Sequence, residues 1–311
     1  MARPDTGVTF RRESFNDMNL IVGATGLVGG EICRRLSSQQ KPVRALVRPT
    51  GDESRIAELR ASGAELATGD LKDIASIRAA CAGATAVLST ASSMLSRQPG
   101  DTIDGVDRIG QLQLVEAAAA AGVQHFVFVS FSVMADDCAL QRAKREVEQA
   151  LMASGMPYTI LRPTFFMEIW FSPVLGFDVA ARRVRIFGTG ENPISWISFP
   201  NVADFAVRAL DAPAARNATF TLGGPEALTP IEVVRIFEEL GGAPFSVEYV
   251  MDSVLRAAKA SARRALDEAF TALSLGYARG DAIDMHATLE AMPVRLVTVR
   301  EYATWLLNEG R

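Results

Sequence analysis

Cysteine and histidine are scarce in this chain, and neither residue type is spaced for a disulfide or a metal site. The 311 residues include three cysteines and two histidines. Cys33, Cys81 and Cys138 form no C-x-x-C pair, and His125 and His286 form no H-E-x-x-H arrangement. These features predict no bound metal, and unpaired cysteines favour a cytoplasmic location.

Excess positive charge and long apolar runs are also missing. Lysine and arginine number 32 against 36 acidic residues, which gives a formal net charge of -4. Without a dense basic stretch, we expect no nucleic-acid partner. Without about 18 uninterrupted apolar residues, we expect no membrane span. Residues 1–18 lack the apolar segment of a signal peptide and are expected to form a flexible arm.

What the chain does contain is a regular alternation of strand-like and helix-like segments. Apolar residues make up 49% and charged residues 22% of the chain, as in ordinary globular proteins. The predicted strands cover 19–23, 43–48, 65–69, 86–90, 125–130 and 158–162, and the predicted helices cover 27–38, 53–62, 73–80, 104–121 and 140–154. This order is typical of an α/β fold with a doubly wound parallel Rossmann sheet.

Glycines and prolines mark the ends of elements and a change in organisation. Gly122 and Gly155 each follow a predicted helix and are expected to end it in the left-handed conformation. From about residue 163, shorter elements with more proline and glycine replace the regular alternation. We therefore predict a dinucleotide-binding core over residues 19–162 and a smaller, interrupted C-terminal substrate lobe over residues 163–311, interleaved with the core.

A glycine-rich turn, GATGLVG, lies between the first predicted strand and the first predicted helix. In such a turn the first glycine permits a tight bend, the second lets a pyrophosphate approach the backbone, and the third lets the helix pack on the strand. A purely structural glycine turn is the alternative. The position of the turn favours a dinucleotide, with predicted contacts at Gly23, Thr25, Gly26, Leu27, Val28 and Gly29.

The end of the second predicted strand indicates which dinucleotide is preferred. NAD-selective proteins of this fold carry an acidic residue there, whereas this chain has Arg48 and no carboxylate before Asp52. A guanidinium can bind the 2′-phosphate of NADP through charge-assisted hydrogen bonds. The alternative is a solvated surface arginine, and we expect NADP(H) to be favoured over NAD(H).

Three further motifs, taken with the glycine turn, identify a family resemblance. They are Gly69-Asp70-Leu71, the segment AAAAGVQHFVFVS at 118–130, and YTILRPTFFME at 158–168. Over roughly residues 19–242 the chain resembles the NmrA-like atypical short-chain dehydrogenases/reductases. The resemblance implies that Asp70 and Leu71 lie near the adenine, although Asp70 could equally cap a turn. It further implies that Ser89, Thr90 and Ala91 line the cofactor. Pro163, Thr164 and Phe165 follow the sixth predicted strand, at the carboxyl edge where ligands bind in such sheets, and are further candidates for cofactor contacts.

The chain departs from the superfamily pattern at its catalytic pair. Typical members use Tyr-x-x-x-Lys on one helix face, whereas this chain has Leu140 and Lys144 at those places. The resemblance implies that Lys144 binds the nicotinamide ribose, with a solvated helix lysine as the alternative. Ser130 and Ser132 follow the fifth strand and are candidates to polarise a substrate carbonyl, or alternatively to cap the next turn.

Aromatic residues after the sixth predicted strand indicate an apolar substrate. Phe166, Trp170 and Trp196 are candidates for the substrate pocket, with core packing as the alternative. We expect an NADPH-dependent reductase that transfers hydride to an apolar, aromatic or conjugated small molecule. A non-catalytic NADP sensor is the second hypothesis, and an assembly subunit that keeps the nucleotide as a structural element is the third.

Overall fold

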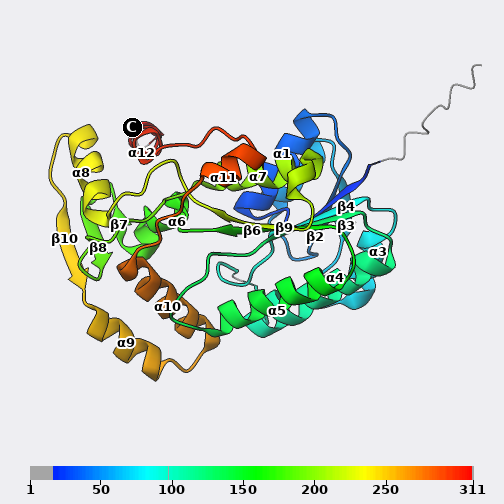
Figure 1. Cartoon of the computed structure of the whole chain (residues 1–311), viewed down its shortest axis with the longest axis horizontal. Helices are drawn as coiled ribbons and strands as arrows, with labels where there is room; N and C mark the ends of the chain where they lie inside the picture. The colour runs from blue at the N-terminus through cyan, green and yellow to red at the C-terminus, as the bar shows by residue number, and fades with distance from the viewer. Residues whose placement is uncertain (1–16, 97, 310–311) are drawn as a thin grey trace, which may run out of the picture.

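The computed structural model describes residues 17–96 and 98–309. All but the last two residues of the predicted N-terminal arm lie outside this described part. A parallel seven-stranded sheet forms the centre of the molecule, with the order β3-β2-β1-β4-β5-β6-β9 (Figure 1). Its strands are β1 (Asn19–Val22), β2 (Val43–Val47), β3 (Glu65–Thr68), β4 (Ala86–Ser89), β5 (His125–Val129), β6 (Tyr158–Pro163) and β9 (Ala218–Leu222).

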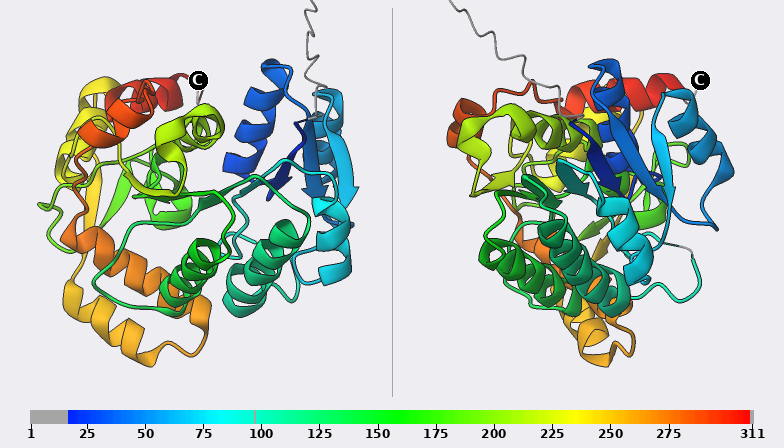
Figure 2. Two further views of the ribbon diagram at one scale, coloured as in Figure 1. Left: turned by 45° about the vertical axis from the view of Figure 1, so that its right-hand side comes forward. Right: turned by 90° about the vertical axis from the view of Figure 1, so that its right-hand side faces the viewer.

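Helices cover both faces of this sheet (Figure 2). One face packs against α1 (Leu27–Ser38), α2 (Glu53–Ala61), α7 (Phe199–Asp211) and α11 (His286–Ala291). The other face packs against α3 (Ile74–Cys81), α4 (Gln111–Ala120) and α5 (Ala139–Ala153). Every residue of β1, β4 and β5 is buried, because the sheet is covered on both sides. The fold class predicted from the sequence is therefore confirmed.

The predicted elements are present, with two differences. Gly122 and Gly155 both have a φ of +74°, which confirms their predicted left-handed conformation. The sequence analysis does not predict β9 as part of the central sheet, because this edge strand is only partly buried. The predicted helix over residues 104–121 instead begins as a π-helical segment, η1 (Ile103–Gly110), and continues as α4.

The remaining elements form a smaller lobe beside the sheet. Its three strands have the order β10-β8-β7, with β7 at Phe177–Asp178, β8 at Arg183–Phe187 and β10 at Ser246–Val250. Its helices are α6 (Met167–Trp170), α8 (Pro230–Gly241), α9 (Asp252–Ser261), α10 (Ala265–Arg279) and α12 (Val299–Glu309), with a short 3-10 helix, η2 (Pro173–Leu175). A second 3-10 helix, η3 (Pro213–Ala215), instead packs on α7 and β9 of the central part. Aromatic side chains dominate the core of this lobe.

Two features of this architecture position the candidate site. The strand order reverses between β1 and β4, which opens a crevice at the carboxyl ends of the strands. From the smaller lobe, α10 returns to pack beside α5 (Figure 1). The loops that leave the parallel strands therefore face elements of both parts of the molecule.

Candidate functional site

The glycine turn brings β1, α1 and the end of β4 too close together for side chains. Gly23 has a φ of +90°, and a Cβ built on it would lie 2.7 Å from Oγ1 of Thr90. A Cβ on Gly29 would lie 2.1 Å from the carbonyl oxygen of Gly23. No side chain caps the start of α1 at Gly26, and no acidic residue lies in its first turn. The N–H groups of this turn are therefore suited to an anion such as a pyrophosphate.

A cavity of about 740 Å³ extends from this turn across the carboxyl edge of the sheet. Most of the predicted site residues line it, including those farthest apart in the sequence. The residues concerned are Gly23, Thr25, Gly26, Leu27, Val28, Arg48, Asp70, Leu71, Thr90, Ala91, Ser130, Ser132, Lys144, Pro163, Thr164, Phe165, Phe166 and Trp170.

Three predicted site residues lie behind the cavity wall. Gly29 packs against Gly23 as described above. Ser89 is fully buried, and its hydroxyl donates to Oε1 of Gln111 at 2.8 Å. Trp196 is also fully buried, and its Nε1 donates to the carbonyl of Leu228 at 3.0 Å. The structure thus differs from the sequence-based placement of Trp196 in the pocket, because its ring fills the core of the smaller lobe.

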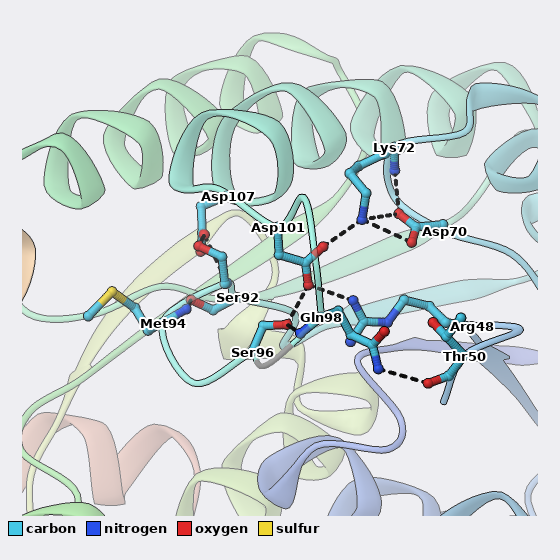
Figure 3. Close-up of polar contacts among 11 residues, drawn as sticks. Arg48, Thr50, Asp70, Lys72, Ser92, Met94, Ser96, Gln98, Asp101 and Asp107 are labelled. Atoms are coloured by element: carbon cyan, nitrogen blue, oxygen red, sulfur yellow. Dashed lines mark hydrogen bonds and ion pairs between the residues drawn. The ribbon is translucent and has the colours of Figure 1, made fainter. Parts of the chain in front are cut away.

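Arg48 lies in an ionic cluster at one end of the cavity (Figure 3). Its Nη1 is 2.6 Å from Oδ2 of Asp101, and Nζ of Lys72 is 2.5 Å from Oδ1 of the same carboxylate. Lys72 also contacts Asp70 at 3.0 Å. No sequence pattern indicates Lys72 and Asp101, because Asp101 is far from Arg48 in the sequence and neither belongs to a motif.

Lys144 is buried at the middle of the cavity, next to a buried carboxylate. Its Nζ lies 3.5 Å from Oδ1 of Asp107 and 4.9 Å from the ring centre of Phe128. The other oxygen of Asp107 accepts hydrogen bonds from the backbone and hydroxyl of Ser93, at 3.0 and 2.6 Å. Burial lowers the pKa of Lys144 below its ordinary value, although Asp107 opposes this shift. Asp107, from the π-helical segment η1, is a third residue that no sequence motif indicates.

Leu140 occupies the place of the missing tyrosine, one helical turn before Lys144. Its side chain is buried and lines the cavity. It packs in an apolar cluster that includes Met134 and Cys138. No phenol therefore stands at this position, and any proton donor must lie elsewhere.

Two hydroxyl groups on the cavity wall are held by one carboxylate. Ser132 and Thr164 donate to Oδ2 of Asp281 at 2.6 and 2.7 Å. Asp281 follows α10 and is fixed by backbone hydrogen bonds to Pro193 and Ser195. Because both hydroxyl protons point to the carboxylate, their oxygen lone pairs remain available as acceptors. Asp281 lies more than 100 residues after both partners, so sequence spacing does not indicate it.

The far end of the cavity is apolar and aromatic. The ring centre of Phe165 lies 5.0 Å from that of Trp170, in an edge-on arrangement. Trp170 in turn stacks on Tyr277, with 5.0 Å between ring centres. Phe270 and Leu273 of α10 line the same cavity. This end is suited to a flat, apolar compound.

Metal-binding clusters and membrane helices are absent from residues 17–96 and 98–309. In this part of the chain, no three His, Cys, Asp or Glu side chains are grouped to hold a metal ion. No helix there is long and apolar enough to cross a membrane.

The glycine turn generates a direct prediction for dinucleotide binding. A Cβ on Gly26 would lie 3.1 Å from the carbonyl of Gly23, and the branched side chain of Gly26→Val would fill space at the start of α1. We expect this variant to fold but to lose binding of NADPH and NADH in calorimetry. Gly30→Ala is the matched control, because its Cβ would lie 3.5 Å from the nearest atom. Unchanged affinity in folded Gly26→Val would place the nucleotide elsewhere.

Comparison with known proteins agrees with this geometry. The NAD(P)H azoreductase of Xenophilus azovorans is 31% identical over 281 residues, which cover 89% of this chain and 92% of that protein. The photosystem II assembly factor Ycf39 of Trieres chinensis is 33% identical over 238 residues, covering 74% and 71%. The structure of Citrobacter sp. triphenylmethane reductase complexed with NADP(H) shares the fold, with a TM-score of 0.72, 19% identity and coverage of 93% and 99%. A model of the NmrA-like family matches residues 16–303, and the chain belongs to that family.

Proposed function

We propose that this chain is an NADPH-dependent reductase that transfers hydride to an apolar, aromatic or conjugated small molecule. The observation that carries this proposal is a single cavity joining the glycine turn and Arg48 to Lys144 and the aromatic wall. The turn fits a pyrophosphate, and the apolar end fits a nicotinamide beside a substrate. NADPH, when bound, would supply the hydride.

Lys144 is the proposed source of the proton that completes the reduction. Its burial lowers the pKa, so its ammonium gives up a proton more readily than that of an exposed lysine. Asp107 holds the ammonium at the cavity from one side. The family resemblance adds a second proposed role for Lys144, which is to bind the nicotinamide ribose.

The proposed substrate class follows from the cavity wall. Phe165, Phe166 and Trp170 provide aromatic surface. Ser132 and Thr164, held by Asp281, provide acceptors for a phenol or amine group on the ligand. The aromatic surface of this wall is compatible with carbonyl compounds, quinones, enones and lignan-like ethers. One relative is named as an azoreductase, and one structure of the same fold is named as a triphenylmethane reductase.

Leu140 favours a second candidate function, a non-catalytic NADP sensor. Typical members of the superfamily have a tyrosine as proton donor at this position, and leucine cannot replace it in that role. Lys144, which would bind the cofactor, is still present. A nucleotide-containing assembly subunit is a third candidate, supported by the likeness to the assembly factor Ycf39. Turnover of a substrate separates the reductase from both alternatives.

We expect the purified protein to oxidise NADPH in the presence of at least one quinone, aryl aldehyde, enone or azo dye. The loss of NADPH absorbance measures this oxidation. Lys144→Met should lower kcat by roughly 10²- to 10⁴-fold, the range for lost proton transfer and positioning. The decline of kcat at alkaline pH should begin below the ordinary lysine pKa of about 10.4 and should disappear in this variant.

Lys259→Met is the matched control, because Lys259 lies on α9 and does not line the cavity. A confirmed substrate whose turnover survives Lys144→Met would exclude the proposed role of Lys144. Tight NADPH binding without turnover of any of the compounds would instead favour the sensor.

Arg48 is proposed to make the chain favour NADPH over NADH. The guanidinium lines the cavity and is only partly exposed, so a fork-shaped contact with a 2′-phosphate would be partly desolvated. We expect calorimetry to show tighter binding of NADPH than of NADH, and Arg48→Ala to lose most of this difference. Arg60→Ala, on the exposed side of α2, should retain it. Equal affinities in the unmutated protein would contradict the assignment.

A further inference from the structure

The positive charges near Arg48 are already balanced by the protein itself. Arg48 and Lys72 face the carboxylates of Asp70 and Asp101, and all four residues line the cavity (Figure 3). Two cations and two anions give the cluster a formal charge of zero. An additional phosphate would therefore meet a neutral cluster in which Nη1 of Arg48 and Nζ of Lys72 are already paired with carboxylates.

Asp101 reaches this cluster from the other side of the crevice. Arg48 follows β2, whereas Asp101 lies between β4 and η1. In the sheet, β1 separates β2 from β4, so the segment after β4 crosses the carboxyl end of β1 to reach Arg48. Asp101 thus meets Arg48 at the carboxyl edge of the sheet, where a dinucleotide would pass.

The carboxylate of Asp101 is charged and firmly held. Its side chain is only 4% exposed. Burial raises its pKa, but hydrogen bonds from Lys72, Ser96 and Arg48 outweigh this effect, so the pKa lies below its ordinary value. The same segment is fixed to the end of β2, because Nε2 of Gln98 donates to the carbonyl of Thr50 at 2.7 Å.

We propose that Asp101 is a built-in competitor of the adenosine 2′-phosphate and thereby limits the preference for NADPH over NADH. This inference rests on the proposed NADPH-dependent function. A 2′-phosphate carries about two negative charges and forms strong hydrogen bonds with arginine and lysine. It binds Nη1 of Arg48 and Nζ of Lys72 only by displacing the carboxylate of Asp101, which is paired with both atoms. Lys72 then becomes its second cationic ligand.

NADH can bind without displacing the carboxylate of Asp101. Its adenosine ribose has a 2′-hydroxyl group, which is neutral and does not compete for the two cations. Asp101 remains paired with Arg48 and Lys72 while NADH is bound. Binding of NADPH therefore includes the loss of existing ion pairs, whereas binding of NADH does not. As a result, the difference between NADPH and NADH affinity is smaller than it would be if Arg48 acted without Asp101.

Asp101→Asn tests this competition, because the amide keeps the shape of the side chain and removes its charge. Isothermal titration of the full chain should show NADPH binding about tenfold tighter than in the unmutated protein, with NADH changed by less than about twofold. Asp104→Asn is the matched control, since Asp104 is three residues away, is exposed and pairs with Arg108. It should leave both affinities unchanged.

Lys72→Met provides an independent test at a partly exposed position, where misfolding is not expected. NADPH affinity should fall about tenfold, with NADH affinity nearly unchanged. The inference would be overturned if Asp101→Asn bound NADPH more weakly or kept the same ratio of NADPH to NADH affinity. It would also be overturned if Lys72→Met kept full NADPH affinity. If the unmutated protein bound neither dinucleotide, the proposed function itself would fail. Binding of both with an unchanged ratio would remove only the role of Asp101.

Discussion

The close approach of α1 and the end of β4 to Gly23 is the constraint on which the rest of the structure depends. Any Cβ at Gly23 or Gly29 would overlap neighbouring atoms, so only glycine permits α1 to start so close to the sheet. This contact directs the uncapped start of α1 into the crevice between β1 and β4. The cavity, the ionic cluster around Arg48 and Lys144 are all arranged around that crevice.

Local patterns in the sequence are sufficient to predict most of the central sheet and the glycine turn. Apolar segments between amphipathic helices identify six of the seven parallel strands, because both faces of the sheet are covered. Positive φ values at Gly122 and Gly155 follow from their places after helices. The unpredicted strand β9 is a partly buried edge strand, and such strands carry a weaker apolar pattern.

The partners of the predicted site residues could not be found in the same way, because they come from distant segments. Asp107, Asp101 and Asp281 each lie near a predicted residue, yet none is at a spacing that a linear motif specifies. Trp196 is the reverse case, a residue that is predicted for the pocket but lies outside it. Its residue type suggested a pocket wall, but the interior of the smaller lobe provides an apolar site and a hydrogen-bond acceptor for its ring.

In the proposed reductase, the cavity holds a nicotinamide next to a reducible aromatic compound. A single-turnover experiment with NADPH deuterated at C4 of the nicotinamide tests it most directly, with enzyme in excess over an azo dye or quinone. We expect that loss of the acceptor coincides with oxidation of the nicotinamide and that both slow when the transferred hydrogen is deuterium. Bound NADPH that stays reduced while the acceptor is unchanged would contradict it.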